Sequence, residues 1–196
     1  MSTTSFTPSR IGFHTITHPT FFTEGVRVLL LKARHKDGQV GHERAIQRVS
    51  HDAVRFHQHM DELLTMMRPY ERIYSTASPR DLAKAYRLFQ SRQVDALYDA
   101  DPMEFPRHLE NRWYSCLMKP ETQSSHGKYW MFDCDGKNEF DTTWSQLTNL
   151  KVEALYSYPT KSGMHILCAP FNKMNITPFS RDLLHDNPLM LWAYHD

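Results

Sequence analysis

The chain has 196 residues, of which 40% are hydrophobic and 23% charged, and its formal net charge at pH 7 is +1. This composition excludes a collagen-like repeat, a coiled coil and an intrinsically disordered chain, and the small charge gives no electrostatic sign of a nucleic-acid-binding protein. No apolar run approaches the roughly 18 residues needed to cross a bilayer, and no signal peptide is visible. We therefore expect a cytoplasmic protein with no membrane partner.

Three cysteines, Cys116, Cys134 and Cys168, are widely spaced along the chain. Their odd number argues against a disulfide framework, and the lack of a C-x-x-C pair argues against a structural zinc. All three have apolar neighbours in sequence, so we expect them to pack as small buried thiols.

The first half of the chain predicts an arm followed by alternating strands and helices. Residues 1–22 are rich in Ser, Thr, Pro and Phe and are expected to form an irregular N-terminal arm, with the folded core over 23–196. Hydrophobic periodicity and turn residues predict, in chain order, a strand over 26–33, a turn over 36–39, a helix over 50–67 and a strand over 72–75. The helix should bury one apolar stripe: Val54, Met60, Leu63, Leu64, Met67.

A second helix is expected to begin at Ser78-Pro79-Arg80-Asp81. Ser78 can cap it, Pro79 suits the first helical position, and Asp81 is favourable near the positive end of the helix dipole. The apolar residues expected on its buried side are Leu82, Ala85, Tyr86, Phe89 and Val94.

The sequence of the second half of the chain predicts more strands than helices. In chain order we expect a loop over 99–107, a strand over 128–135, a helix over 140–150, a hairpin of strands over 152–158 and 164–169, and a last strand over 189–193. This order predicts an α+β fold, in which a single domain packs its helices on a mixed, largely antiparallel sheet.

An acidic pair, Asp133 and Asp135, closes the apolar strand of 128–135. Residues two apart on a strand point to the same face, with their Cα atoms roughly 6.6 Å apart. Two carboxylates placed together repel each other unless a cation lies between them, and a divalent cation fits such a pair. The pair is therefore a candidate metal site. The alternative is that the strand ends at Asp133 and both acids are solvated turn residues.

The hairpin turn carries small, hydroxyl and basic residues that suit an anion. Ser162 and Gly163 can aim a hydroxyl and a backbone N–H at a phosphate, and Lys161 adds a cation. His165, early in the following strand, can donate to a phosphate oxygen. A surface hairpin with a satisfied histidine is the alternative.

A third carboxylate, Asp186, precedes the last strand. If it lay near the acidic pair, the three acids would allow two metal ions roughly 3.5–4 Å apart, as in polymerases and nucleases. Asp182 is a competing candidate, and a turn residue ahead of Pro188 is the simpler interpretation of Asp186.

In this order the three motifs resemble the catalytic core of the archaeo-eukaryotic primase (primase-polymerase) superfamily. That family has an apolar strand ending in D-x-D, a later hairpin with Ser and His, and a final hydrophobic-then-Asp motif, which here correspond to 132–135, 162–165 and 185–186. The stretch 160–172 also resembles small versions of this core carried by bacteriophages, which would act in the host cell cytoplasm. The resemblance covers 113–192 well and the N-terminal half only in its αβ layout.

The resemblance implies an RRM-like palm behind an N-terminal αβ unit, and a DNA primase-polymerase that makes or extends primers on single-stranded DNA from nucleoside triphosphates. It implies that Asp133, Asp135 and Asp186 hold two Mg²⁺ or Mn²⁺ ions, and that Ser162 and His165 hold the triphosphate. Further nucleotide contacts are assigned to Lys161, Gly163 and Lys128. Template contacts are assigned to the helix that begins near 78, through Arg80, Lys84 and Arg87, although a solvated helix face also explains these three.

Some features depart from the family pattern. His185 stands where the family has an apolar residue, and the three cysteines cannot form a zinc-binding stalk. A bare core of this kind would need a partner such as a replicative helicase or polymerase, or would act only on exposed single strands. Two alternatives stay open: a catalytically degenerate core that binds nucleic acid or a nucleotide, and a two-metal nuclease.

Two histidine pairs, His14 with His18 and His57 with His59, are expected to face solvent. Pro19 disfavours a helix at the first pair, and residues two apart on a helix point to different faces, which separates the second pair.

Overall fold

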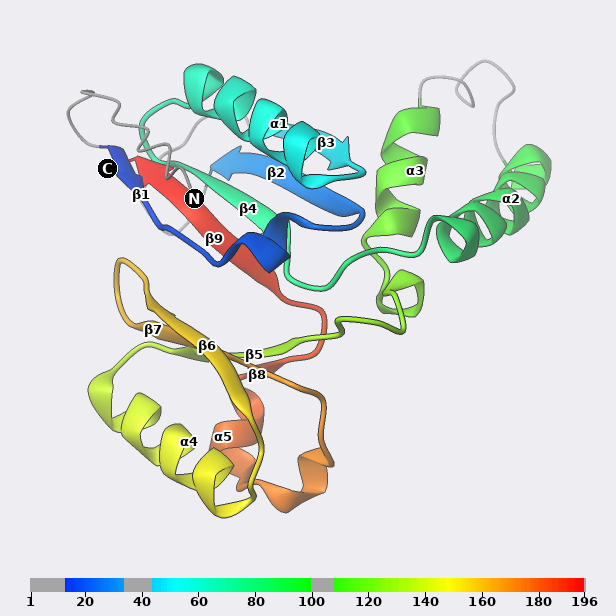
Figure 1. Cartoon of the computed structure of the whole chain (residues 1–196). Coiled ribbons are helices and arrows are strands. Elements are labelled where there is room, and N and C mark those ends of the chain that lie inside the picture. Colours follow the sequence, from blue (N-terminus) through cyan, green and yellow to red (C-terminus); the bar gives the residue numbers. More distant parts are fainter. Residues whose placement is uncertain (1–12, 34–43, 100–107, 196) are drawn as a thin grey trace.

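Two antiparallel sheets with helices on their outer faces make up the part of the chain that the structure describes (Figure 1). The computed structural model describes residues 13–33, 44–99 and 108–195. The turn predicted over 36–39 and nearly all of the loop predicted over 99–107 lie outside the described residues. From top to bottom of Figure 1, the layers are α1, the first sheet, the second sheet, and α4 with α5. The predicted α+β class is confirmed, whereas the RRM-like palm stays a prediction.

The first sheet combines strands from both ends of the chain. Its strand order is β1 (Phe13–Thr15), β9 (Leu189–His195), β4 (Glu71–Thr76), β2 (Arg27–Ala33), β3 (Ala45–Ser50). The last strand therefore lies between β1 and β4 and pairs antiparallel with both. Because β2 is covered on both faces, it is buried from Arg27 to Leu31.

The second sheet is built from the C-terminal half alone. Its strand order is β6 (Ala154–Pro159), β7 (Met164–Cys168), β5 (Trp130–Cys134), β8 (Leu184–His185). Strands β6 and β7 form the predicted hairpin. The short strand β8 pairs with the middle of β5, which places His185 opposite Met131.

Helix α1 (Ala53–Met66) covers the first sheet, and its buried residues are spaced four, three and one apart along one stripe: Phe56, Met60, Leu63, Leu64. Its N-terminus is capped by Asp52, whose side chain accepts a hydrogen bond from the backbone N–H of Arg55. The expected stripe was wrong at Val54, which is 67% exposed, because the stripe that faces the sheet passes through Phe56 instead.

Four further helices are α2 (Leu82–Asp99), α3 (Leu109–Leu117), α4 (Lys137–Asn149) and α5 (Pro178–Asp182). In Figure 1, α2 and α3 stand beside the layers, whereas α4 and α5 cover the second sheet. Ala85 of α2 is buried in a small cluster with Leu117, but Tyr86 and Val94 are each 55% exposed. The buried stripe predicted for this helix was therefore wrong at Tyr86 and Val94, because α2 packs mainly on α3 and not on a sheet.

The start of α2 differs from the predicted one. The side chain of Asp81 accepts from the backbone N–H of Lys84, so Asp81 and not Ser78 caps the helix. The hydroxyl of Ser78 instead accepts from the backbone N–H of Tyr129 and donates to its carbonyl. Ser78 therefore joins the approach to α2 with the chain just before β5.

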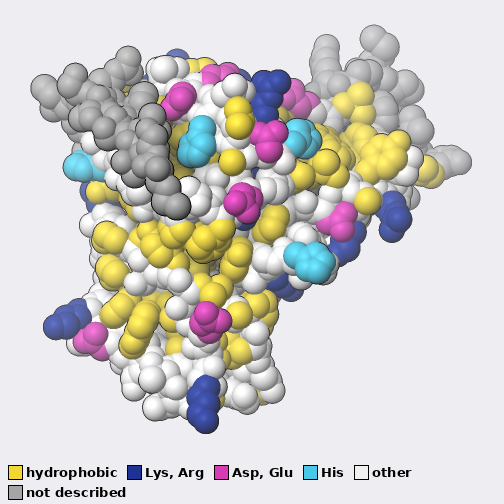
Figure 2. Space-filling model, in the orientation of Figure 1, with side chains coloured by type: hydrophobic (Ala, Val, Ile, Leu, Met, Phe, Trp, Pro, Cys, Tyr) yellow, Lys and Arg dark blue, Asp and Glu magenta, His cyan; other side chains and the backbone are white. Residues whose placement is uncertain are grey.

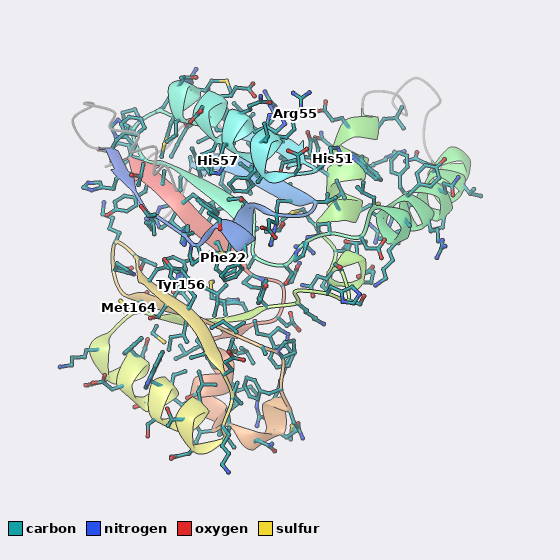
Figure 3. All side chains as sticks on the ribbon, viewed as in Figure 1. Phe22, His51, Arg55, His57, Tyr156 and Met164 are labelled. Atoms are coloured by element: carbon teal, nitrogen blue, oxygen red, sulfur yellow. The ribbon has the colours of Figure 1, made fainter. Side chains whose placement is uncertain are left out.

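The N-terminal arm is ordered where it is described. After β1, the chain forms a 3₁₀ helix, η1 (Thr20–Thr23), whose Phe22 is fully buried. Figure 3 places Phe22 beside Tyr156 of β6, and their ring centroids are 5.8 Å apart. His18 is also buried, so the expectation that it faces solvent was wrong, whereas His57 is exposed as expected. The described part of the arm therefore contributes the buried side chains of His18 and Phe22 to the core.

The two faces of the second sheet differ in chemistry. One face packs on α4 and is apolar: Trp130, Phe132, Cys134, Ile166, Cys168. The alternate residues face the first sheet and include two polar side chains: Met131, Asp133, His165, Leu167. Figure 2 shows hydrophobic side chains gathered across the middle of the molecule, where the sheets meet. The prediction that the three cysteines are free and buried is confirmed.

Among the described residues, no helix combines the length and the apolar character that a bilayer crossing requires.

Candidate functional site

A cavity of about 330 Å³ lies between the two sheets near the end of β5. The second sheet and its hairpin contribute Met131, Asp133, Asp135, Thr160, Ser162 and His165. The first sheet contributes Arg72, Tyr74, Leu189 and Leu191, β8 contributes His185, and the link from β8 to β9 contributes Asn187 and Pro188. The acidic pair and the hairpin residues Ser162 and His165 thus share one cavity.

Asp133 and His165 are direct cross-strand neighbours in the pairing of β5 with β7. The Nε2 atom of His165 lies 3.0 Å from Oδ1 of Asp133. The Asp133 side chain is 46% exposed, whereas that of His165 is 10% exposed. One histidine nitrogen therefore orients a carboxylate that keeps access to the cavity.

The other nitrogen of His165 contacts the buried hydroxyl of Tyr158. Nδ1 of His165 lies 2.7 Å from this oxygen, which also accepts a hydrogen bond from the backbone N–H of Leu191 at 3.2 Å. Burial raises the pKa of Tyr158, so the hydroxyl keeps its proton at neutral pH. A continuous hydrogen-bond chain thus joins β9 of the first sheet to Asp133 of the second.

The turn of the β6–β7 hairpin presents Ser162 to the cavity and uses Gly163 for packing. Thr160 and Gly163 close the turn, since the N–H of Thr160 donates to the Gly163 carbonyl at 2.8 Å and the N–H of Gly163 donates to Oγ1 of Thr160 at 3.1 Å. A Cβ atom on Gly163 would overlap the carbonyl oxygen of Cys134. The backbone N–H of Gly163 is therefore engaged within the hairpin, and Lys161 is exposed beside it.

Asp186 does not join the acidic pair. Its Oδ2 atom accepts a hydrogen bond from Nζ of Lys173 at 2.9 Å, and its neighbour His185 lines the cavity instead. The hydrogen bond from Lys173 lowers the pKa of Asp186, and the charges of Lys173 and Lys128 act in the same direction. The expected cluster of three carboxylates is thus replaced by a pair of acids and a separate ion pair. Lys128 is exposed ahead of β5 and does not line the cavity.

The acidic pair offers ligands for a divalent cation, but it does not form a complete cage. Among residues 13–33, 44–99 and 108–195, no three His, Cys, Asp or Glu side chains are grouped to hold a metal ion. Mg²⁺ is commonly bound through one or two carboxylates together with substrate phosphates and water. Asp133 and Asp135 fit that mode, because both line a cavity that has room for a phosphate group.

Arg80 is a structural residue and not an exposed nucleic-acid contact, so the assignment of Arg80 to the template is corrected. Its side chain is buried and donates to the carbonyl of Lys119 at 3.3 Å and to Oδ1 of Asn187 at 2.8 Å. Burial, together with the nearby charge of Arg27, lowers the pKa of Arg80 to about 10. By holding Asn187, Arg80 positions the link from β8 to β9 at the rim of the cavity.

The other two residues of the predicted basic stripe, Lys84 and Arg87, lie exposed on α2. Nζ of Lys84 donates to the carbonyl of Gln123 at 3.2 Å and lies 3.9 Å from Asp81. Neither Lys84 nor Arg87 lines the cavity.

Several residues that line the cavity or contact its lining were absent from the sequence prediction. Arg72 and Tyr74 belong to a strand far from the motifs, and nothing local marks them. His185 is adjacent to the predicted Asp186, and Tyr158 precedes the predicted hairpin turn by one residue. For these two residues, the β5–β8 and β6–β7 registers supply the missing information, because they place His185 opposite Met131 and Tyr158 opposite His165.

Comparisons of the chain with protein-family models, with curated proteins and with solved structures gave no match. The resemblance to primase-polymerases therefore rests on the three motifs and their order.

Proposed function

We propose that the protein is a metal-dependent nucleotidyltransferase of the primase-polymerase type, which makes or extends primers on a single-stranded DNA template. The observation that carries this proposal is the shared cavity: the D-x-D acids and the Ser and His of the hairpin come from separate parts of the chain and line one space of about 330 Å³.

Different residues at the cavity would bind the cation and the triphosphate. Asp133 and Asp135 would hold a divalent cation, Mg²⁺ or Mn²⁺, which when bound lowers the pKa of a primer 3′-hydroxyl and neutralises phosphate charge. Ser162 and Thr160 would donate hydroxyl hydrogen bonds to the triphosphate, and Lys161 would add positive charge at the turn. Arg72 extends the basic character to the opposite wall. Such catalysis needs positioned charges and little covalent chemistry by the protein.

A second candidate is a nucleotide-binding protein that does not polymerise. It is favoured by one observation, the ion pair between Asp186 and Lys173, which leaves the cavity with two predicted carboxylate ligands instead of three. A two-metal reaction would require Asp186 to leave Lys173. A nuclease would use the same acids, with water in place of the primer hydroxyl.

Incubation with labelled nucleoside triphosphates and single-stranded DNA, with Mg²⁺ or Mn²⁺, tests these candidates together. Extended products support the primase-polymerase, and shortening of end-labelled strands without nucleotides supports the nuclease. Nucleotide binding without any product supports the binding protein. Activity that survives Asp133→Ala combined with Asp135→Ala would contradict the proposal.

A matched control is Asp141→Ala, which removes an exposed carboxylate of α4 that does not line the cavity. This variant should keep full activity. A loss of activity in both Asp141→Ala and the double variant would indicate a general effect of charge or folding and not a site.

A further inference from the structure

We propose that Tyr158 is a positioning residue for Asp133: its hydroxyl orients the ring of His165 so that Nε2 donates to the Asp133 carboxylate. The catalytic importance of this role rests on the proposed function, since it assumes that Asp133 binds the cation. The contacts themselves can be tested without metal or nucleotide.

Tyr158 is placed to act on Asp133 through His165. It is 1% exposed and lies directly opposite His165 in the pairing of β6 with β7. Its hydroxyl oxygen is 2.7 Å from Nδ1 of His165, and the two rings meet edge to face with centroids 5.0 Å apart. Tyr158 does not line the cavity, and among its hydrogen-bond partners in the described part of the chain His165 is the one that is hydrogen-bonded to Asp133.

The donors and acceptors allow one arrangement of hydrogens on a neutral His165. The Asp133 carboxylate can only accept, so Nε2 of His165, 3.0 Å away, carries the hydrogen. Nδ1 is then an acceptor, and the O–H of Tyr158 is its donor. The competing acceptor for this hydroxyl, the sulfur of Met131, is 3.9 Å away and intrinsically weak.

The same hydroxyl is anchored from the first sheet. The backbone N–H of Leu191 donates to the Tyr158 oxygen at 3.2 Å, and the carbonyl of Leu191 is held by Nε2 of His18 at 2.7 Å. These bonds fix the oxygen relative to β9 while its hydrogen points to His165. The position of a cavity carboxylate is thus tied to the packing of the two sheets, in the manner of outer-shell partners that orient metal ligands.

Nitrogen-15 NMR of the side chain at pH 8 tests the arrangement in the wild-type protein. The signals of His165 are identified by their loss in His165→Gln. We expect the proton on Nε2 and an upfield shift of Nδ1, as for a nitrogen that accepts a hydrogen bond. A proton on Nδ1, or an Nδ1 signal at the position of a free nitrogen, would overturn the inference even if no variant folds.

Tyr158→Phe removes the hydroxyl and keeps the ring. We expect the upfield shift of Nδ1 to be lost and the carbon-13 signal of the Asp133 carboxyl group to move. In the His165→Gln background, Tyr158→Phe should leave the Asp133 signal in place, because the intermediary is gone. The matched control is Tyr156→Phe on the same strand. The hydroxyl of Tyr156 donates a hydrogen bond to the carbonyl of Thr17 at 2.9 Å and not to His165, so its removal should leave the His165 and Asp133 signals in place.

The outcomes separate this inference from the proposed function. An Asp133 signal unmoved by Tyr158→Phe, or moved equally with and without His165, overturns the positioning role whether or not the protein polymerises. Signals that change as expected in a protein without nucleotidyltransferase activity support the positioning role and contradict the proposed function instead.

Discussion

The two faces of the second sheet differ in chemistry, although the same strands form both. The face on α4 is an apolar core in which Phe132 and Ile166 are fully buried. The face toward the first sheet carries Asp133, which follows Phe132 in β5, and His165, which precedes Ile166 in β7. A hydrogen bond joins these two side chains, and both line the cavity. Because strand residues alternate between faces, one strand can supply packing energy and a reactive group at consecutive positions.

This difference suggests that stability and chemistry can be changed separately. Substitutions on the α4 face should act on the free energy of unfolding, whereas substitutions at the cavity should act mainly on ligand binding.

Phe132→Ala should reduce the free energy of unfolding by about 3–5 kcal/mol, because it leaves a cavity in a fully packed face. Asp133→Ala, one position along the same strand, should cost only about 1 kcal/mol through the lost hydrogen bond to His165. Urea unfolding of both variants measures the contrast. Equal losses would mean that the two faces do not divide their roles in this way.

Acidification should weaken the contact between the sheets through His18. Burial lowers its pKa from 6.5 to about 4, so between these values the unfolded chain takes up a proton that the folded chain does not. Stability is therefore complete above about pH 6.5 and falls as the pH decreases toward 4, by up to about 3 kcal/mol. Urea unfolding at pH 7 and pH 4.5 measures the loss.

The control for this pH dependence is His18→Gln, which retains a donor for the carbonyl of Leu191 but does not titrate. Its stability should depend less on pH than that of the wild type over the same interval. The same slope in both proteins would assign the acid sensitivity to other groups.

Gly163→Ala should destabilise the fold by about 1–3 kcal/mol, because the new methyl group overlaps the carbonyl of Cys134 and displaces the hairpin. It should also weaken nucleotide binding, since Ser162 moves with the turn. Gly136→Ala is the matched control, because no atom lies within 4 Å of a Cβ there. Thermal unfolding and nucleotide titration measure both effects, and equal losses for the two variants would exclude the steric explanation.

Lys173→Met should change the free energy of unfolding by less than about 1 kcal/mol, because its ion pair with Asp186 is solvent-exposed. The apolar side chain can still cover Trp130, over whose ring the Lys173 ammonium lies. Release of Asp186 should tighten Mn²⁺ binding, which calorimetric titration measures. Unchanged affinity would indicate that Asp186 takes no part in cation binding.

The sequence was informative where neighbouring residues decide the outcome. The spacing of apolar residues predicted α1 and β5, and alternation predicted that Asp133 and Asp135 share a face. It was misleading at Arg80, because an exposed and a buried arginine look alike in sequence. The distinction lies in the acceptors that surround the side chain, here Lys119 and Asn187.

Local periodicity alone was thus sufficient for β2, β4, β5, β9, the β6–β7 hairpin and the D-x-D pair, because each depends on backbone geometry over a few residues. It did not predict β1, β3 or β8. Only the tertiary structure decided that the last strand inserts between β1 and β4 and brings Leu191 to Tyr158. It also decided that Asp186 pairs with Lys173 outside the cavity. Contacts between distant segments depend on how whole sheets pack, and no short stretch of sequence encodes that packing.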